Sequence, residues 1–175
     1  MNEALPEIQK FHFPEGKDIP NHPHLPTLIY RQVKKPGTTD LASWWNQTLH
    51  RNNWKGLWRG SVFDYHHFHP RSHEFLGIAR GQATLQLGGQ EGETVEVQPG
   101  DGILIPAGVG HKKVESSRGF QVIGGYPSGQ ENPEIFRQLS IISDAIRSGI
   151  KATSLPEKDP VFGNSGSLFQ YWKDI

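Results

Sequence analysis

Four of the nine histidines in this chain lie within residues 66–73, and a glutamate follows them at position 74. In a β-strand, side chains alternate between the two faces, so His67 and His69 would point to the same side if residues 61–69 form a strand. Glu74 follows a proline break and can enter the same space from the neighbouring backbone. Two imidazoles and a carboxylate placed in this way can hold a divalent transition metal.

A fourth ligand is expected from residues 100–111, where His111 ends an apolar run interrupted by glycine and proline. Three imidazole nitrogens and one carboxylate oxygen suit Mn, Fe, Co, Ni, Cu or Zn, and they do not suit Mg or Ca. Around a six-coordinate metal, this set leaves two positions open for water, oxygen or a bidentate substrate. The expected cofactor is therefore a divalent transition metal, whose identity the ligand set does not fix.

The histidines of this segment leave alternatives open. His66 falls on the opposite face of the expected strand, which favours a role on the surface or in a seam between elements. His73 replaces Glu74 as the ligand if the bend at Pro70 shifts the register of the chain. Structural burial without any metal is the alternative for the three ligand histidines.

Together, the two segments resemble the two sequence motifs of the cupin superfamily. The first motif is carried by Gly60, His67, His69, Glu74 and Gly81, and the second by Gly100, Pro106, Gly108 and His111. The chain has one extra residue after the opening glycine, and Glu115 stands where the family pattern usually has an asparagine. That departure concerns a polar neighbour of the site and leaves the ligand set complete. The resemblance also implies a homodimer, with the N-terminal strand or the terminal helices at the contact.

Short strands separated by glycine and proline turns indicate the fold class. The expected strands are residues 83–87 and 93–97, which form a hairpin, followed by residues 103–105, 111–114 and 120–123. This pattern favours an all-β antiparallel barrel or two-sheet jelly roll. Cupins have that fold, a double-stranded β-helix, here with short flanking α-helices in the N- and C-terminal extensions.

A chain of 175 residues is long enough for one domain with a proper core and too short for two comfortable ones. We expect an N-terminal extension (residues 1–59), a barrel carrying the motifs (residues 60–126), and a C-terminal helix and tail (residues 127–175). In the first extension we expect an extended arm over residues 1–26, an edge strand over residues 27–33, and a helix capped by Thr38, Thr39 or Asp40 that runs to about His50.

The C-terminal part is expected to form a helix from Pro133 to Gly149, with Asn132 as its N-cap, and then a loop that ends in an edge strand over residues 168–172. Four of the five tryptophans fall within residues 44–58. They are expected in a lid or in the seam between helix and barrel, and the alternative is an aromatic wall for a substrate.

The composition limits the partners. Lysine plus arginine equals aspartate plus glutamate at 18 each, so no long-range field favours nucleic acid or an anionic membrane. The absence of cysteine excludes disulfides and thiolate ligands and fits a reducing compartment. The sequence has neither a signal peptide pattern nor an apolar run of the ~18 residues that span a membrane. A cytoplasmic protein with a small-molecule ligand or substrate is expected.

These features favour a metal-dependent enzyme of a small organic molecule, of the dioxygenase or another oxidoreductase type. Lewis-acid isomerisation or decarboxylation would use the same ligands, with Glu115, Tyr65 or Lys113 as a proton shuttle. The imidazoles also need acceptors for their second N–H groups, and Glu115 or Gln86 is expected to serve. The alternative from another class is a cupin that binds or senses a metal or small ligand without turning it over. A metal-free, epimerase-like cupin would need a broken ligand set, and this set is intact.

Overall fold

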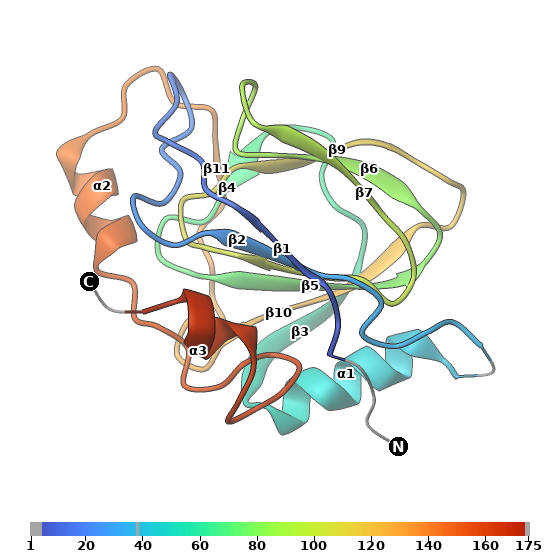
Figure 1. The fold of residues 1–175 in the computed structure, drawn as a ribbon. Coiled ribbons are helices and arrows are strands. Elements are labelled where there is room, and N and C mark those ends of the chain that lie inside the picture. Colours follow the sequence, from blue (N-terminus) through green and yellow to red (C-terminus); the bar gives the residue numbers. More distant parts are fainter. Residues whose placement is uncertain (1–4, 38, 174–175) are drawn as a thin grey trace.

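The computed structural model describes residues 5–37 and 39–173. Within this part of the chain the strands form two antiparallel sheets that face each other (Figure 1). The six-stranded sheet has the order β1 (Ile8–Phe11), β2 (Thr27–Tyr30), β8 (Gly102–Ile105), β5 (Glu74–Arg80), β10 (Gln121–Pro127) and β3 (Trp54–Gly60). The five-stranded sheet has the order β11 (Phe136–Arg137), β4 (His67–Phe68), β9 (His111–Ser116), β6 (Ala83–Leu87) and β7 (Glu93–Val97). The predicted antiparallel jelly roll is confirmed.

The alternation of side chains along β5 explains why both faces of the six-stranded sheet are buried. Leu76 and Ile78 join the core between the two sheets, where Leu85 of β6 meets them. Phe75 and Ala79 belong to a second core, which lies under α1 (Leu41–Arg51) and α3 (Ser167–Tyr171). A strand covered on both sides reads as a nearly continuous apolar run, which is what residues 75–79 are.

The helix α1 begins where the sequence places a capping residue. The side chain of Asp40 accepts hydrogen bonds from the backbone N–H groups of Ala42 and Ser43 at 3.1 and 3.4 Å. Of the three predicted caps Asp40 is therefore used, while Thr38 lies outside the described residues. The helix ends at Arg51, close to the predicted His50.

The tryptophans of α1 and β3 form the seam between helix and barrel. Trp45 is fully buried, and its Nε1 donates a hydrogen bond to the carbonyl of Ile78 at 3.0 Å. Its ring lies on the bare backbone of Gly77, where a Cβ atom would overlap it. Trp54 donates to the carbonyl of Lys158 at 3.1 Å and so joins the C-terminal tail to the barrel. The predicted seam role is confirmed for these two tryptophans.

The predicted helix over residues 133–149 is wrong in its first half. Phe136–Arg137 forms β11, which pairs antiparallel with β4, and the helix α2 (Asp144–Lys151) begins only after the N-cap Ser143. Phe136 packs edge-to-face on Phe68 of β4 with ring centroids 5.7 Å apart. Strand pairing and this aromatic contact outweigh the helical spacing of the apolar residues.

The predicted edge strand over residues 168–172 is also wrong, because that segment forms α3. The carboxylate of Asp159 accepts from the N–H of Leu168 at 3.1 Å, as an N-cap side chain would. Trp172, which follows the helix, donates to the carbonyl of Pro26 at 2.8 Å. Contacts with distant residues therefore hold this tail in its helical conformation.

Two further boundaries differ from the prediction. The expected strand over residues 61–69 is interrupted, because β3 ends at Gly60 and β4 contains only His67 and Phe68. The strand β2 is not at the sheet edge, since β1 from the expected arm pairs along its outer side. Backbone pairing of an N-terminal segment thus completes the six-stranded sheet.

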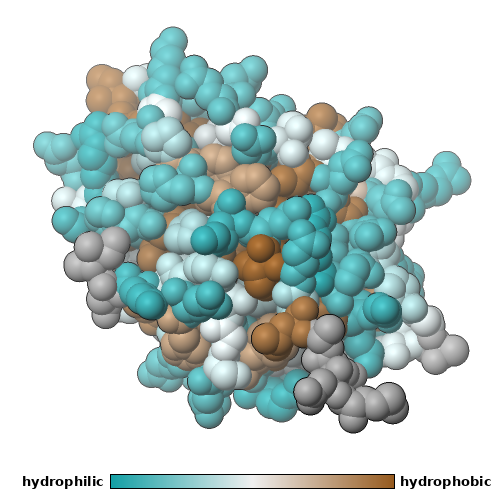
Figure 2. Space-filling view, in the orientation of Figure 1, coloured by the Kyte–Doolittle hydropathy of each residue, from teal (hydrophilic) through white to brown (hydrophobic). Residues whose placement is uncertain are grey.

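In the orientation of Figure 1, hydrophilic residues cover most of the surface, and hydrophobic residues show between them in limited areas (Figure 2). Among the described residues, no helix combines the length and the apolar character that crossing a membrane requires.

Candidate metal centre

The three predicted ligand histidines meet at one point between the sheets. His67 in β4 pairs directly with His111 at the start of β9, and His69 is the residue immediately after β4. One ring nitrogen from each of the three lies within 4.8 Å of the others, and all three residues are buried. The structure thus contains a buried histidine triad suited to a metal ion.

Glu74 reaches the same point from the start of β5. Its two carboxylate oxygens lie 3.2 Å from Nε2 of His69 and 3.2 Å from Nε2 of His111. All four predicted ligands are therefore brought together. Glu74, and not His73, faces the triad, because the strand that begins at residue 74 turns adjacent side chains to opposite faces.

Backbone carbonyls orient the three imidazoles. Nδ1 of His67 lies 3.1 Å from the carbonyl of Tyr65, Nδ1 of His69 lies 2.8 Å from that of Glu134, and Nδ1 of His111 lies 3.0 Å from that of Val109. A carbonyl oxygen can only accept, so each Nδ1 carries the hydrogen and each Nε2 is left for the centre of the site.

The expected acceptors Glu115 and Gln86 are thus replaced by main-chain carbonyls. Gln86 instead donates to the carbonyl of Gln90 at 2.9 Å on the exposed side of the hairpin. The sequence carries no direct signal for carbonyl partners, because every residue has a carbonyl group and only the tertiary structure aims it.

The Nε2 atoms at the centre form an arrangement that calls for a cation. Within the described residues, the buried Nε2 atoms of His69 and His111 have no hydrogen-bond partner of suitable geometry. With hydrogen on Nδ1, each Nε2 is an acceptor, and the nearby Glu74 carboxylate is an acceptor too. Acceptors that face one another at 3.2 Å require a shared positive charge, which is either a proton or a metal ion.

The pKa values of Glu74 and His69 both shift in the direction that favours the charged form of each group. Burial opposes the ionisation of Glu74, but the charge of His69 and the close imidazoles of His69 and His111 outweigh it and lower the pKa of Glu74. Burial likewise opposes protonation of His69, but the charge of the nearby Glu74 carboxylate outweighs it and raises the pKa of His69. Burial and the neighbouring His111 lower the pKa of His67 to about 3. A bound metal would take the place of the proton on His69.

The triad opens into a cavity of about 290 Å³. Its walls are largely apolar and aromatic, with contributions from Trp58, Val62, Phe63, Leu76, Tyr126 and Ile135. Phe63 and Ile135 are 44% and 50% exposed, which places them at its mouth. Sequence reasoning missed Tyr126, and it offered a substrate wall only as the alternative for the tryptophans. Of the four tryptophans within residues 44–58, Trp58 is the one that lines this cavity.

The three residues expected as proton shuttles are placed differently. Lys113 donates from Nζ to the hydroxyl of Ser61 at 3.0 Å, at the rim of the cavity. The ring of Tyr65 lies beside the ring of His67, with the two centroids 5.8 Å apart. The guanidinium of Arg137 lies over the Tyr65 ring, 3.7 Å from its centroid. Both are therefore close to the site, and their catalytic role stays a prediction.

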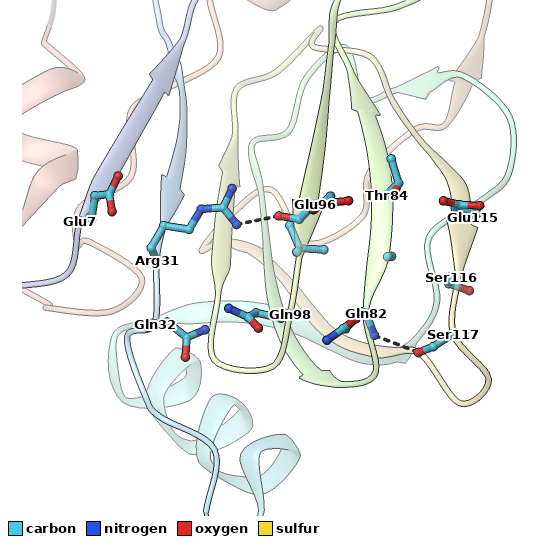
Figure 3. Close-up of a pocket in the computed structure, with 12 residues that line it drawn as sticks. Glu7, Arg31, Gln32, Gln82, Thr84, Glu96, Gln98, Glu115, Ser116 and Ser117 are labelled. Atoms are coloured by element: carbon cyan, nitrogen blue, oxygen red, sulfur yellow. Dashed lines mark hydrogen bonds between the residues drawn. The ribbon is translucent and has the colours of Figure 1, made fainter.

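Glu115 is not brought to the triad. It pairs with Thr84 of β6 and is exposed on the outer face of the five-stranded sheet. There it lines a separate polar groove of about 680 Å³ together with Thr84, Glu96 and Arg31 (Figure 3). Figure 3 shows Arg31 reaching from the end of β2 to β7, where it donates to the carbonyl of Glu96 at 2.7 Å. Proton transfer by Glu115 in the metal cavity therefore has no geometric support.

The remaining histidines of the segment are buried elsewhere. His66 is 4% exposed, and neither of its ring nitrogens has a hydrogen-bond partner among the described residues. His73 is fully buried, accepts from the N–H of Ala107 at 2.9 Å and packs against Trp172 at 4.8 Å. It lies 6.4 Å from the ring of His22, which the N-terminal arm contributes.

His22 makes the stability of the arm dependent on pH. Its Nδ1 accepts from the N–H groups of His24 and Leu25 at 3.1 and 2.9 Å, so the neutral ring is the form that fits. Burial, aided by the charges of His24 and His12, lowers the pKa of His22 to about 4 from 6.5. Between pH 6.5 and about pH 4, His22 is protonated in the unfolded chain and neutral in the folded chain. The free energy of unfolding must therefore fall as the pH drops through this range.

We expect the urea midpoint to decrease from pH 7 to pH 4.5, and the decrease to be smaller in His22→Asn, whose amide oxygen can accept the same N–H groups. The exposed helix residue His50 supplies the matched control, since His50→Asn should keep the slope of the unmodified protein. Equal slopes in the unmodified protein and in His22→Asn would contradict this account.

Comparison with known proteins agrees with the geometry. Residues 56–117 match the family model described as the cupin domain. Over 166 residues the chain is 39% identical to the uncharacterized protein YjlB of Bacillus subtilis (strain 168). The aligned region covers 95% of this chain and 97% of YjlB.

Solved structures show more distant similarity. The polyketide cyclase RemF of Streptomyces resistomycificus is 18% identical with a TM-score of 0.36, over 85% of this chain and 91% of RemF. Acireductone dioxygenase from Bacillus anthracis, with a cadmium ion in its active centre, is 21% identical with a TM-score of 0.35, over 49% and 57% of the two chains. The family assignment rests on the cupin model and on YjlB. By both findings, this chain belongs to the cupin superfamily.

Proposed function

We propose that this protein is a metal-dependent enzyme that acts on a small organic molecule, as an oxidoreductase of the dioxygenase or a related type. The observation that carries the proposal is the set of buried acceptors around one point, three imidazole nitrogens and the Glu74 carboxylate. Such a set of nitrogen and oxygen donors fits a divalent transition metal.

The residues of the chain have distinct parts in this proposal. His67, His69, His111 and Glu74 would hold the metal, and the carbonyls behind the imidazoles keep each Nε2 directed at the point where it would bind. The apolar walls bury the substrate and exclude water, which strengthens every electrostatic interaction inside. When bound, a metal of this class supplies Lewis-acid or redox chemistry at its open positions.

A binding or sensing protein is the second candidate. Besides the four proposed ligands, Tyr126 is the ionisable side chain on the lining of the cavity within the described residues. With so few groups for acid–base catalysis, the site would depend on its metal for any reaction. A protein that binds its ligand without a reaction is therefore the alternative that the experiments must distinguish.

Elemental analysis of protein purified without a histidine tag tests the metal site. We expect close to one equivalent of a transition metal, and a loss of that metal in the His67→Ala, His69→Ala double variant. Equal metal content in both proteins would overturn the proposed site.

Oxygen uptake tests the reaction class. The iron-loaded protein is offered a panel of diketones, phenols and carboxylic acids, and the double variant serves as the blank. Uptake that requires both substrate and an intact triad supports the oxidoreductase. Silence with every metal and compound, in a protein that retains its metal, would favour the binding protein.

A further inference from the structure

Two segments of the chain meet at the mouth of the cavity, and each contributes one partly exposed apolar side chain to the cavity lining. Phe63, from the loop that joins β3 to β4, is 44% exposed. Ile135, the residue just before β11, is 50% exposed. A molecule that reaches the histidine triad through this mouth must therefore pass these two side chains.

Each of the two segments also orients one of the proposed metal ligands. The carbonyl of Tyr65, in the loop before β4, lies 3.1 Å from Nδ1 of His67. The carbonyl of Glu134, in the segment before β11, lies 2.8 Å from Nδ1 of His69. A movement of either segment would therefore change the width of the mouth and the direction of one imidazole together.

A contact between a cation and an aromatic ring joins the two segments. The guanidinium of Arg137 in β11 lies 3.7 Å from the centroid of the Tyr65 ring, and Phe63 stacks on the same ring with the centroids 4.9 Å apart. The face of a tyrosine ring attracts a cation placed over it. This contact, called the Arg137–Tyr65 clasp below, connects the segment that orients His69 to the segment that orients His67.

The segment that contains β11 depends on such contacts, because it buries little of its own surface. Among residues 128–141, all of which the structure describes, none is buried. Gln130 fixes one end through two hydrogen bonds of its side chain at 2.9 and 2.8 Å, and the N–H of Leu139 fixes the other by donating to the carbonyl of Asp18 at 2.9 Å. Between these ends, β11 pairs over only two residues with β4 (Figure 1). A segment with so few buried contacts opens at a lower free energy than the core.

We infer that Arg137 is a positioning residue of the metal centre, which closes the mouth of the cavity and keeps His67 and His69 aimed by holding the ring of Tyr65. Closing the mouth and aiming these two ligands are then parts of one movement. The inference rests on the proposed function, because the direction of the two imidazoles matters to a metal that they hold.

The zinc affinity of Arg137→Ala, measured by competition with a chromophoric chelator, is the first test. Loss of the clasp should weaken zinc binding about two- to fivefold, which corresponds to the strength of an exposed cation–π contact. The charge of the guanidinium by itself predicts the opposite sign, because a cation repels the metal ion and its removal strengthens binding. Arg137→Lys should restore most of the affinity, since an ammonium also binds the face of the ring. Equal or tighter zinc binding by Arg137→Ala would overturn the inference.

A double-variant cycle shows whether Arg137 acts through Tyr65. Tyr65→Leu removes the ring and should weaken zinc binding, and Arg137→Ala in that background should cause no further loss, because the two side chains act as a pair. Arg118→Ala is the matched control, since it removes the same charge from the exposed turn between β9 and β10 and should keep the zinc affinity unchanged. Additive losses from the two substitutions would contradict the clasp.

Amide hydrogen exchange of the metal-free protein tests the clasp without a metal. Over residues 131–136, whose intrinsic exchange rates do not depend on the side chain at position 137, Arg137→Ala should exchange about two- to fivefold faster than the unmodified protein. Residues 74–80 of β5 lie in the core and should exchange at the same rate in both proteins. An unchanged rate over residues 131–136 would overturn the clasp at any metal content.

The outcomes separate this inference from the proposed function. Faster exchange in Arg137→Ala, in a protein that binds no zinc in any form, would support the clasp and overturn the metal site. Zinc binding with the same affinity in Arg137→Ala and in Arg118→Ala would overturn the inference and leave the metal site intact.

Discussion

Replacing His111 by alanine is expected to weaken zinc binding by more than about 100-fold, since even partners that merely orient a ligand contribute 10–100-fold. His111 supplies one of the three converging nitrogens and also contacts Glu74. Its loss removes a ligand and leaves the carboxylate with fewer partners in a buried site. Competition with a chromophoric zinc chelator measures the affinity of each protein.

Two controls accompany this prediction. His50→Ala changes the same residue type on the exposed side of α1 and should keep the affinity of the unmodified protein. Circular dichroism of His111→Ala should retain the spectrum of a β-rich fold, which separates loss of a ligand from loss of structure. If His111→Ala binds zinc as tightly as His50→Ala, then the four residues do not form the metal site.

Replacing Asp159 by alanine is expected to lower the free energy of unfolding by about 3–5 kcal/mol, because several buried donors lose their acceptor together. Asp159 is fully buried, and its carboxylate accepts from the hydroxyl of Tyr30 at 2.8 Å. It also accepts from the N–H groups of Val161, Phe162 and Leu168 at 2.8, 2.9 and 3.1 Å. One side chain thus ties the C-terminal tail to β2.

Urea unfolding followed by tryptophan fluorescence reports this change, since Trp54 and Trp172 both contact the tail or belong to it. Asp144→Ala is the control, because that side chain is 99% exposed at the start of α2 and its loss should cost less than about 1 kcal/mol. A midpoint for Asp159→Ala equal to that of the control would contradict the role assigned to this carboxylate.

The ligand set illustrates how far sequence reasoning reaches. The positions of His67, His69, Glu74 and His111 could be predicted because two motifs with fixed spacing carry them. The expected uninterrupted strand over residues 61–69 is wrong, and yet the two histidines converge. A short β4 is sufficient, because its pairing with β9 fixes the position of the first imidazole.

The errors fall where distant contacts override local preference. Residues 133–143 have helical spacing, but part of this segment pairs with β4 as a strand. Residues 168–172 have the composition of a strand, but most of them lie in α3, whose first turn is bound by the Asp159 carboxylate through the N–H group of Leu168. Glu115 follows the second motif closely in sequence, but a register shift between Lys113 and Glu115, where β9 pairs with β6, turns it to the outer face.

The sequence by itself determined the fold class, the four candidate ligands and the kind of metal they suit, because these follow from residue types and from local spacing. Only the tertiary structure decided which atoms surround those ligands. The carbonyls of Tyr65, Val109 and Glu134 come from separate segments. Their roles depend on how the two sheets bring them together, and no local pattern records that arrangement.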